Sequence, residues 1–281
     1  MKLAIAQIKP SLGDLEFNLA LHYKYIHQAI EDNVNLLIFP ELSLTGYSLK
    51  DLTDEVAIRQ NDNKLRQLYD YSKKLDIIFG LVEESEEFLF YNSAIYLSRG
   101  IVGHTHRKIY LPTYGMFEEG RHFARGDSLR SFNSLFGKSG ILICEDAWHS
   151  ICPLILTLQG TILIINIANG TARGLGSQFR IDSARIWENM NSFYAANHSL
   201  YFVFCNRVGV EDGVTFWGGS EVVDPSGKVI AKASYFDEQF IVADIDFTVV
   251  RRARIKSPLL RDERLDFSQN ELRRIIQSDK D

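Results

Sequence analysis

Three segments of the chain each place one reactive side chain beside residues that would otherwise indicate only a buried core or a loop. Glu41 ends the apolar run Leu36–Pro40, Lys108 begins an aromatic-rich loop, and Cys144 ends the apolar run Ile141–Ile143. A carboxylate, an amine and a thiol can together take up a proton, stabilise a developing oxyanion and attack a carbonyl carbon. These residue types therefore predict acyl-transfer chemistry.

Cys144 is the thiol whose position favours a reactive role. A cysteine in an apolar strand is most often an inert small hydrophobe. Here the apolar run gives way at once to Glu145 and Asp146, which cannot continue a core. We therefore expect Cys144 at the carboxyl end of a strand, where α/β proteins build their sites. Cys205 is a second, weaker candidate, and Cys152, which precedes a proline, is interpreted as structural.

Glu41 and Lys108 carry less information alone, because an isolated glutamate or lysine is usually a solvated surface charge. Glu41 has apolar neighbours, so we expect it at the mouth of a strand or buried with a partner, since an unpaired buried charge is too costly. The loop at residues 111–117 is too apolar and aromatic for an ordinary surface loop, and Glu118 and Glu119 follow it. This pattern is typical of a pocket wall with charged groups behind it.

We expect short apolar strands, alternating with amphipathic helices, to position these groups. The apolar runs predict strands over residues 2–7, 35–39, 77–82, 91–99, 101–108, 139–144, 161–167, 200–206, 218–224, 227–233 and 239–246. Helical spacing predicts helices over residues 18–33, 54–74 and 178–197. Gly100 and Pro225-Ser226-Gly227 supply turn residues for hairpins. Because the apolar strands need cover on both faces, we predict one α/β domain with two sheets packed face to face and helices outside.

Composition excludes several classes of protein. The chain has 31 basic and 36 acidic residues, a net charge of −5, which argues against a nucleic-acid binder. Three cysteines are too few for a disulfide framework and suit a reducing compartment. The chain runs from its first residues into a strand pattern without a signal peptide, and its apolar runs are too short to span a bilayer. We therefore expect a cytoplasmic protein without a membrane partner.

No other catalytic or cofactor motif competes with these three groups. The seven histidines show no metal-binding spacing, and the Gly-x-Ser-x-Gly pattern of serine hydrolases is absent. The glycine-rich stretches 170–176 and 218–219 lack the dinucleotide and P-loop patterns. We expect neither a metal nor an organic cofactor.

The three segments, taken in order, resemble the nitrilase superfamily of carbon–nitrogen hydrolases over about residues 1–265. The resemblance depends on the motifs Phe-Pro-Glu41, Lys108-x-x-Leu-Pro and Cys144-Glu-Asp-x-Trp148. Within the superfamily the chain is most similar to the glutaminase domain of glutamine-dependent NAD synthetase, through residues 45–52, 111–123 and 144–148. The resemblance implies a four-layer α-β-β-α sandwich. We expect residues 1–250 to form the hydrolase domain, and residues 251–281 either a solvated tail or an arm that packs on a partner subunit.

The resemblance also implies roles for named residues. Cys144 would be the nucleophile, Glu41 the general base and Lys108 the oxyanion-stabilising cation. Glu119, preferred to Glu118 from the family pattern Phe-x-Glu, would be a second carboxylate that positions Lys108 or the leaving amine. The substrate-binding residues would be Tyr114, Phe117, Glu145, Trp148, Thr171 and Arg173. The alternative is that Phe117 and Trp148 are only core residues and that Arg173 is a solvated loop charge.

The chain departs from the glutaminase pattern in two places. It ends at Asp281, so we expect no ATP-using synthetase domain, and its loop 168–173 lacks the usual Ser-Pro and His-Gly-Lys-like residues. The leading hypothesis is therefore a stand-alone amidase that acts on a small linear amide. The alternatives are a glutaminase subunit that supplies ammonia to a separate synthetase, a nitrilase, and a non-catalytic scaffold. We also expect a homo-oligomer.

Overall fold

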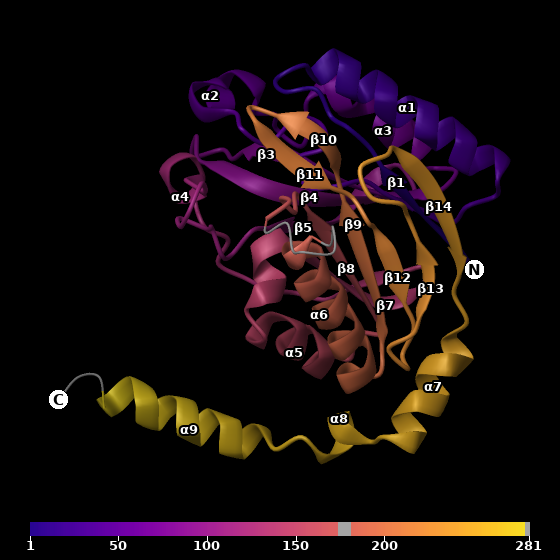
Figure 1. Ribbon diagram of the computed structural model, residues 1–281, viewed down its shortest axis with the longest axis vertical. Helices are drawn as coiled ribbons and strands as arrows, with labels where there is room; N and C mark the ends of the chain where they lie inside the picture. Colours follow the sequence, from indigo (N-terminus) through magenta and orange to yellow (C-terminus); the bar gives the residue numbers. More distant parts are fainter. Residues whose placement is uncertain (174–180, 279–281) are drawn as a thin grey trace.

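Two six-stranded mixed sheets pack face to face, and helices cover the outer face of each sheet (Figure 1). The computed structural model describes residues 1–173 and 181–278. The predicted α-β-β-α order is confirmed. Both sheets have parallel strands at their centre and antiparallel strands at their edges, so the carboxyl ends of the central strands face the same end of each sheet.

The first sheet combines strands from both ends of the chain. Its order is β14 (Gln239–Asp244), β1 (Lys2–Gln7), β2 (Leu36–Ile38), β3 (Asp76–Glu84), β4 (Phe90–Ser98) and β5 (Ile101–Arg107). The predicted hairpin of β4 and β5 is confirmed. Its turn places Arg99 and Gly100 at φ values of 56° and 81°, which glycine adopts readily.

The second sheet is built from the middle of the chain. Its order is β13 (Val229–Lys232), β12 (Glu221–Val223), β9 (Tyr201–Asn206), β8 (Leu163–Ala168), β7 (Gly137–Ile143) and β6 (Phe132–Ser134). The short hairpin of β10 (Val208–Glu211) and β11 (Val214–Trp217), which was not predicted, pairs separately from both sheets.

Amphipathic helices complete the outer layers. On the first sheet lie α1 (Leu15–Glu31) and α3 (Arg66–Tyr71), and on the second sheet lie α5 (Ile151–Leu158) and α6 (Asp182–His198). The helix predicted over 18–33 begins earlier because the carboxylate of Asp14 accepts a hydrogen bond from the backbone N–H of Phe17 and caps it. The helix predicted over 178–197 corresponds to α6, and its first three residues lie outside the described chain.

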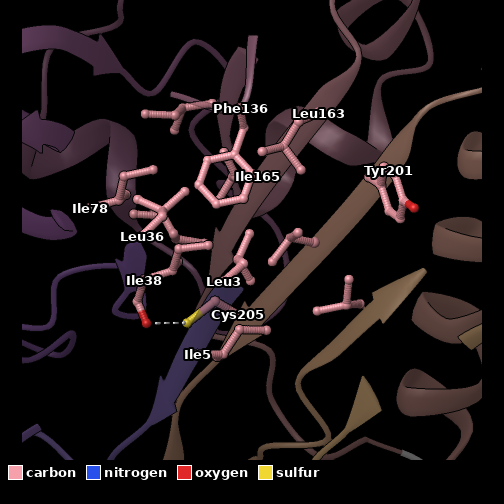
Figure 2. Close-up of a cluster of buried hydrophobic side chains, with 14 of the residues drawn as sticks. Leu3, Ile5, Leu36, Ile38, Ile78, Phe136, Leu163, Ile165, Tyr201 and Cys205 are labelled. Carbon is pink, nitrogen blue, oxygen red and sulfur yellow. Dashed lines mark hydrogen bonds between the residues drawn. The ribbon is translucent and has the colours of Figure 1, made fainter. Parts of the chain in front are cut away.

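Figure 2 shows the apolar layer between the two sheets. Leu3 and Ile38 from the first sheet meet Ile165 and Cys205 from the second, all of them fully buried. The thiol of Cys205 donates to the carbonyl oxygen of Ile38 over 3.7 Å. Close packing of this layer holds the two sheets in one fixed relation, which any site formed between their ends requires.

The helix predicted over 54–74 is wrong. It breaks into α2 (Thr53–Val56) and α3, with extended chain between them. The backbone N–H of Ile58 donates to Val82, and the backbone N–H of Glu84 donates to the carbonyl of Ile58. β2 is too short to pair with this half of β3, so the free backbone of β3 captures Ile58 and outweighs the local helical preference.

The last predicted strands do not form one hairpin. β12 and β13 pair with each other, but the strand predicted over 239–246 crosses to the first sheet, where Ala243 pairs with Leu3. The sequence pattern indicated a strand correctly and could not indicate which sheet it joins.

The chain ends in α7 (Phe247–Lys256), α8 (Leu259–Asp262) and α9 (Leu265–Ser278), which run past one end of the sandwich (Figure 1). α9 leaves large apolar side chains exposed, namely Leu265, Phe267, Leu272, Ile275 and Ile276. The existence of a separate arm at 251–281 stays a prediction. Among the described residues, no helix is both long and apolar enough to cross a membrane.

Candidate active site

Glu41 and Lys108 meet at the carboxyl ends of the strands of the first sheet. The segment after β2 crosses directly over β3, where a Cβ at Gly80 would lie 2.3 Å from the backbone nitrogen of Leu42. Glu41 therefore reaches Lys108, which follows β5. Its Oε1 accepts hydrogen bonds from Lys108 Nζ over 2.7 Å and from Asn92 Nδ2 over 2.7 Å. Both charged side chains are fully buried, and their pairing offsets the cost of that burial.

Glu119, the first residue of α4 (Glu119–His122), is the second carboxylate on Lys108. Its Oε1 accepts from Lys108 Nζ over 2.8 Å and from the hydroxyl of Tyr47 over 2.7 Å. Its other oxygen, Oε2, is buried and has no partner among the described residues. The structure thus brings Glu119, rather than the exposed Glu118, to the predicted lysine.

Cys144 occupies a strained turn directly after β7. Its φ of 47° lies in the left-handed region, which costs a non-glycine residue roughly 1–2 kcal/mol. The turn continues as a short 3₁₀ helix, Cys144–Trp148, and lifts the thiol out of the strand. Strain of this kind persists only where the surrounding structure fixes it.

Asp146 fixes that turn to the loop that carries Lys108. Its Oδ1 accepts from the backbone N–H groups of Ile109 and Tyr110, each over 3.0 Å. Its Oδ2 accepts from the backbone N–H of Ile143 over 3.1 Å and lies 2.8 Å from His106 Nε2. One buried carboxylate therefore joins the segment before Cys144 to the segments on both sides of Lys108.

The thiol of Cys144 lies within the electric field of this charged group. Burial, and then the negative charge of Glu41, raise the pKa of Cys144 well above its ordinary value. Lys108 and the backbone N–H of Asn169 act in the opposite direction, and that N–H also donates to Glu41 Oε2 over 2.7 Å. The resting side chain is therefore a neutral thiol, which needs a base at the moment of attack.

The charges of Glu41, Lys108 and Glu119 also determine whether Lys108 and Glu119 are protonated. Burial alone would lower the pKa of Lys108, but Glu119 and Glu41 together raise it well above its usual value. Burial raises the pKa of Glu119 to about 7, against the opposing pull of Lys108 and with a contribution from Glu41. The group thus has a permanently charged cation and a carboxyl that exchanges its proton near neutrality.

Four of the predicted substrate-binding residues lie together. The hydroxyl of Tyr114 donates to both oxygens of Glu145, over 3.0 and 3.1 Å. The ring of Phe117 stands edge-on to that of Tyr114, and the guanidinium of Arg173 lies 4.6 Å from the Phe117 centroid. Tyr114 is close enough to Cys144 for ionisation of that thiol to act on its hydroxyl. Burial first, and then Glu145 and Cys144, raise the pKa of Tyr114 to about 12. A cation and an anion thus face one region next to the thiol.

The other two predicted residues make different contacts. Trp148 is 40% exposed and packs edge-on against Trp187 of α6. Thr171 is buried and forms a backbone bridge to Phe216 of β11. These contacts do not join them to the cluster of Tyr114, Phe117, Glu145 and Arg173, so their role in substrate binding stays a prediction.

The sequence also matches the model of a known protein family. The family model for carbon-nitrogen hydrolase matches residues 2–255. The chain belongs to the carbon–nitrogen hydrolase family. This finding confirms the resemblance to the nitrilase superfamily that the motifs indicated.

The relatives of this carbon–nitrogen hydrolase are named as several different kinds of enzyme. The glutamine-dependent NAD(+) synthetase of Thermotoga maritima is 32% identical over 92% of this chain but over 44% of its own length. The chain thus spans about half the length of such curated relatives. A nitrilase of Pyrococcus abyssi is 29% identical over 95% of this chain and 98% of its own. The crystal structure of a carbon-nitrogen hydrolase from Helicobacter pylori G27 superposes with a TM-score of 0.85 at 25% identity, covering 97% of this chain and 98% of that one.

The sequence analysis did not predict several residues that form hydrogen bonds around the active site. The side chains of Tyr47 and Asn92 and the backbone N–H of Asn169 bond to a predicted catalytic carboxylate. The side chain of Asp146 bonds to the loop that carries Lys108. The signal for Asn92 is a polar amide inside an otherwise apolar strand. Tyr47 and Asp146 stand in motifs that supported the resemblance without a role of their own, whereas Asn169 lies in the loop that departs from the glutaminase pattern.

Two cavities flank the loop that carries Phe117. One, of about 340 Å³, is bordered by Tyr47 and Glu119. The other, of about 380 Å³, is bordered by Thr171 and Arg173. Within residues 1–173 and 181–278, no group of His, Cys, Asp or Glu side chains is arranged to hold a metal ion.

Proposed function

We propose that this carbon–nitrogen hydrolase is an amidase that cleaves a small linear amide to an acid and ammonia. The observation that carries the proposal is the buried contact of Lys108 Nζ with Glu41 at 2.7 Å and Glu119 at 2.8 Å, with the thiol of Cys144 in the electric field of these charges. Such a group has an acceptor for the thiol proton and a cation for the oxyanion beside one nucleophile.

In the proposed mechanism Glu41 takes the proton of Cys144 as sulfur attacks the amide carbon. Lys108 and the backbone N–H of Glu145 stabilise the tetrahedral oxyanion. The C–N bond breaks, ammonia leaves with a proton from the carboxyl groups, and a thioester remains on Cys144. Water activated by Glu41 then releases the acid and restores the thiol.

The cluster of Tyr114, Phe117, Glu145 and Arg173 supports a substrate with charged groups at its far end. Glu145 suits an ammonium group, and Arg173 suits a carboxylate. We propose an ω-amide of an amino or dicarboxylic acid, with the carbonyl carbon placed at Cys144 and the charged end at this cluster. Glutamine is one such amide, and the NAD(+) synthetase relative from Thermotoga maritima is named as glutamine-dependent.

The test is ammonia release over a panel of glutamine, asparagine, succinamic acid, butyramide and matching nitriles. The wild-type chain should hydrolyse an amide and form an acyl adduct on Cys144 that mass spectrometry detects. The Cys144→Ala variant should do neither, whereas the Cys205→Ala variant should do both. Ammonia release by purified Cys144→Ala would refute the proposal.

Two alternatives each have a specific observation behind them. The similarity to about half of an NAD(+) synthetase supports a glutaminase subunit that feeds a separate synthetase. Such a subunit would hydrolyse glutamine slowly alone and faster once an ammonia-dependent NAD synthetase is added. The full-length similarity to a nitrilase supports cleavage of nitriles, which the same panel measures.

We further propose that the protein works as a homo-oligomer in the cytoplasm. The exposed apolar side chains of α9 favour a contact between subunits through residues 251–281. All three cysteines are free, as expected in a reducing compartment. Light scattering of the full chain and of a chain with charged residues at Leu272 and Ile276 tests the oligomer.

A further inference from the structure

Tyr47 donates a hydrogen bond to Glu119 but has no role in the proposed mechanism. The Oε1 atom of Glu119 accepts from the hydroxyl of Tyr47 over 2.7 Å and from Lys108 Nζ over 2.8 Å. Its Oε2 atom is buried and has no partner in the described part of the chain. Because both donors lie on Oε1, the proton that this carboxyl exchanges belongs on Oε2. Tyr47 therefore helps to determine which oxygen of Glu119 is protonated.

The hydroxyl of Tyr47 is a lasting donor. Burial of the hydroxyl, and then the charges of Glu119 and Glu41, raise the pKa of Tyr47 well above its ordinary value. The hydrogen bond favours the ionised form of Glu119, so Tyr47 acts with Lys108 against the burial and the charge of Glu41 that raise the pKa of Glu119 to about 7. The other titratable groups that border the same cavity as Glu119 are Lys50, Glu118, His122 and Asp212.

Glu211, the last residue of β10, holds the backbone at Tyr47. Its Oε1 accepts from the backbone N–H groups of Tyr47 over 2.9 Å and of Ser48 over 2.7 Å. Its Oε2 accepts from Arg207 Nη1 over 2.8 Å, and Arg207 also donates to the carbonyl of Pro10 over 3.3 Å. Both charged side chains are buried. The segment that carries Tyr47 is therefore tied to the hairpin of β10 and β11 by an ion pair.

The same hairpin packs against the ring of Tyr47. Phe216 of β11 stands edge-on to that ring, with the centroids 6.1 Å apart, and the guanidinium of Arg207 lies 4.3 Å from the Phe216 centroid. Gly46 precedes Tyr47 at a φ of 81°, and a Cβ there would lie 3.1 Å from Glu211 Oε2. Glycine thus permits both the turn and the close approach of the carboxylate.

We propose that Tyr47 is a positioning residue for Glu119. The buried pair of Arg207 and Glu211 holds Tyr47 in that position. A buried ion pair rarely stabilises a protein more than apolar residues of the same volume, and the fixed geometry that it imposes is its use here. The inference rests on the proposed amidase function, in which the carboxyl groups give a proton to the leaving ammonia. Because Tyr47 stabilises the ionised form of Glu119, it makes this carboxyl a better proton donor.

Tyr47→Phe tests the hydroxyl and leaves the ring in place. Tyr96→Phe is the matched control, because the hydroxyl of Tyr96 also donates to a buried carboxylate, that of Asp76, over 2.5 Å. We expect Glu119 to lose its proton about one pH unit higher in Tyr47→Phe, because a hydrogen bond to a charged acceptor is lost. Tyr96→Phe should leave this pH unchanged.

The first readout needs no turnover. It is the Tm of Glu119→Gln relative to its parent chain, measured between about pH 5 and pH 9. Glutamine does not titrate, so this difference rises with pH until Glu119 of the folded parent is ionised, and then it levels off. With Tyr47→Phe as the parent, the curve should level off about one pH unit higher than with the wild-type or Tyr96→Phe parent. The same plateau in all three parents would overturn the inference.

The second readout is the pH profile of kcat/KM for the amide that is hydrolysed fastest in the panel. One limb of this profile should move to higher pH in Tyr47→Phe and stay in place in Tyr96→Phe. If the Tm plateau moves but no amide is hydrolysed, the amidase proposal fails while the role of Tyr47 at Glu119 stands. Amide hydrolysis with an unmoved profile in Tyr47→Phe, or with equal shifts in both variants, would overturn this inference alone.

Glu211→Asp tests the part played by the hairpin. It keeps the charge beside Arg207, but the side chain is one methylene shorter and cannot reach the guanidinium and both backbone N–H groups together. We expect kcat to fall about tenfold when Glu211→Asp is added to Tyr96→Phe, and less than about twofold when it is added to Tyr47→Phe, since Glu211 acts through the lost hydroxyl. Equal losses in both backgrounds would mean that the ion pair only stabilises the fold.

Discussion

Cys144 and Cys205 belong to the same sheet, two strands apart, yet their surroundings differ in every respect that matters for chemistry. Cys205 lies in the layer between the sheets, among apolar side chains, and its thiol donates to the carbonyl oxygen of Ile38 (Figure 2). Cys144 leaves its strand in a left-handed turn and lies among Glu41, Lys108 and Glu119.

Burial raises the pKa of both thiols well above the ordinary value, so burial alone does not distinguish a reactive cysteine from a structural one. For Cys205 burial is the cause of the raised pKa, and no charged group of the described residues contributes to it. For Cys144 a carboxylate and a cation also act on the thiol. The comparison indicates that a nucleophile in this fold is made by the charges around the turn that carries it.

The largest contrast should come from replacing each cysteine by alanine. Cys144→Ala should abolish amide hydrolysis, because no other group in the proposed mechanism forms the thioester. Cys205→Ala should keep the wild-type rate and lower the free energy of unfolding by about 1 kcal/mol, since it removes a small apolar group from a packed layer. Steady-state kinetics and urea unfolding measure both effects, and loss of activity in a folded Cys205→Ala chain would contradict the comparison.

The sequence predicts the reactive residues around Cys144 better than it predicts the residues that hold them in position. Glu41, Lys108 and Cys144 could be predicted because each breaks an apolar or aromatic pattern at the end of a strand. Tyr47 could not, because its hydroxyl reaches Glu119 across 72 positions of the chain. Likewise, the contact of Asn92 with Glu41 depends on how the segment after β2 crosses β3.

The fold shows the same limit. Strands and their order of appearance follow from local patterns, and most predicted strands are present. The failures at Ile58 and at β14 both involve pairing with a distant strand, which no local pattern encodes. Non-local hydrogen bonds therefore decide these two parts, whereas the hairpin of β10 and β11 that was also missed is local.

A second way to test the comparison is to remove the charges around Cys144. Glu41→Gln and Lys108→Met should each lower kcat/KM by roughly 10³-fold or more, because each removes a group used only in the transition state. The double variant should cost much less than the product of the two losses, since the groups act on one step. Activity within about tenfold of wild type in either single variant would remove that residue from the mechanism.

The position of the turn at Cys144 can be tested through Asp146. Asp146→Asn keeps one acceptor oxygen but cannot hold all of the groups now bound, namely the N–H groups of residues 109, 110 and 143 and the ring of His106. We expect kcat to fall about 10- to 100-fold with a smaller change in KM, because the thiol and Lys108 lose their fixed relation.

Asp76 provides the matched control for that variant. It is also buried and accepts a hydrogen bond, from Tyr96, and within the described part of the chain it forms no hydrogen bond with Glu41, Lys108, Glu119 or Cys144. Asp76→Asn should lower stability without this loss of kcat. Equal kcat losses in both variants would mean that the effect of Asp146→Asn is general destabilisation.

A substitution in the cluster of Tyr114, Phe117, Glu145 and Arg173 should change substrate binding rather than the chemical step. Arg173→Gln should raise KM about tenfold for amides that carry a carboxylate and leave kcat nearly unchanged, because it removes an ion pair present before and during the reaction. Neutral amides such as butyramide should be unaffected. Arg59 lies over the ring of Phe88 as Arg173 lies over that of Phe117, so Arg59→Gln is the matched control. An equal rise in KM for neutral amides would exclude a carboxylate partner for Arg173.

The smallest expected effect concerns the pH dependence of stability. Since burial raises the pKa of Glu119 from 4.5 to about 7, the folded chain keeps a proton that the unfolded chain releases in this interval. The free energy of unfolding therefore falls as pH rises between these values. Glu119→Gln removes this contribution, so its Tm relative to wild type should rise by roughly 2–4 °C between about pH 5 and pH 8. Glu118→Gln, at an exposed carboxylate, should show no such trend. A relative Tm that stays constant or falls would mean that Glu119 is ionised throughout this range, and then it could not return a proton to a leaving amine near neutrality.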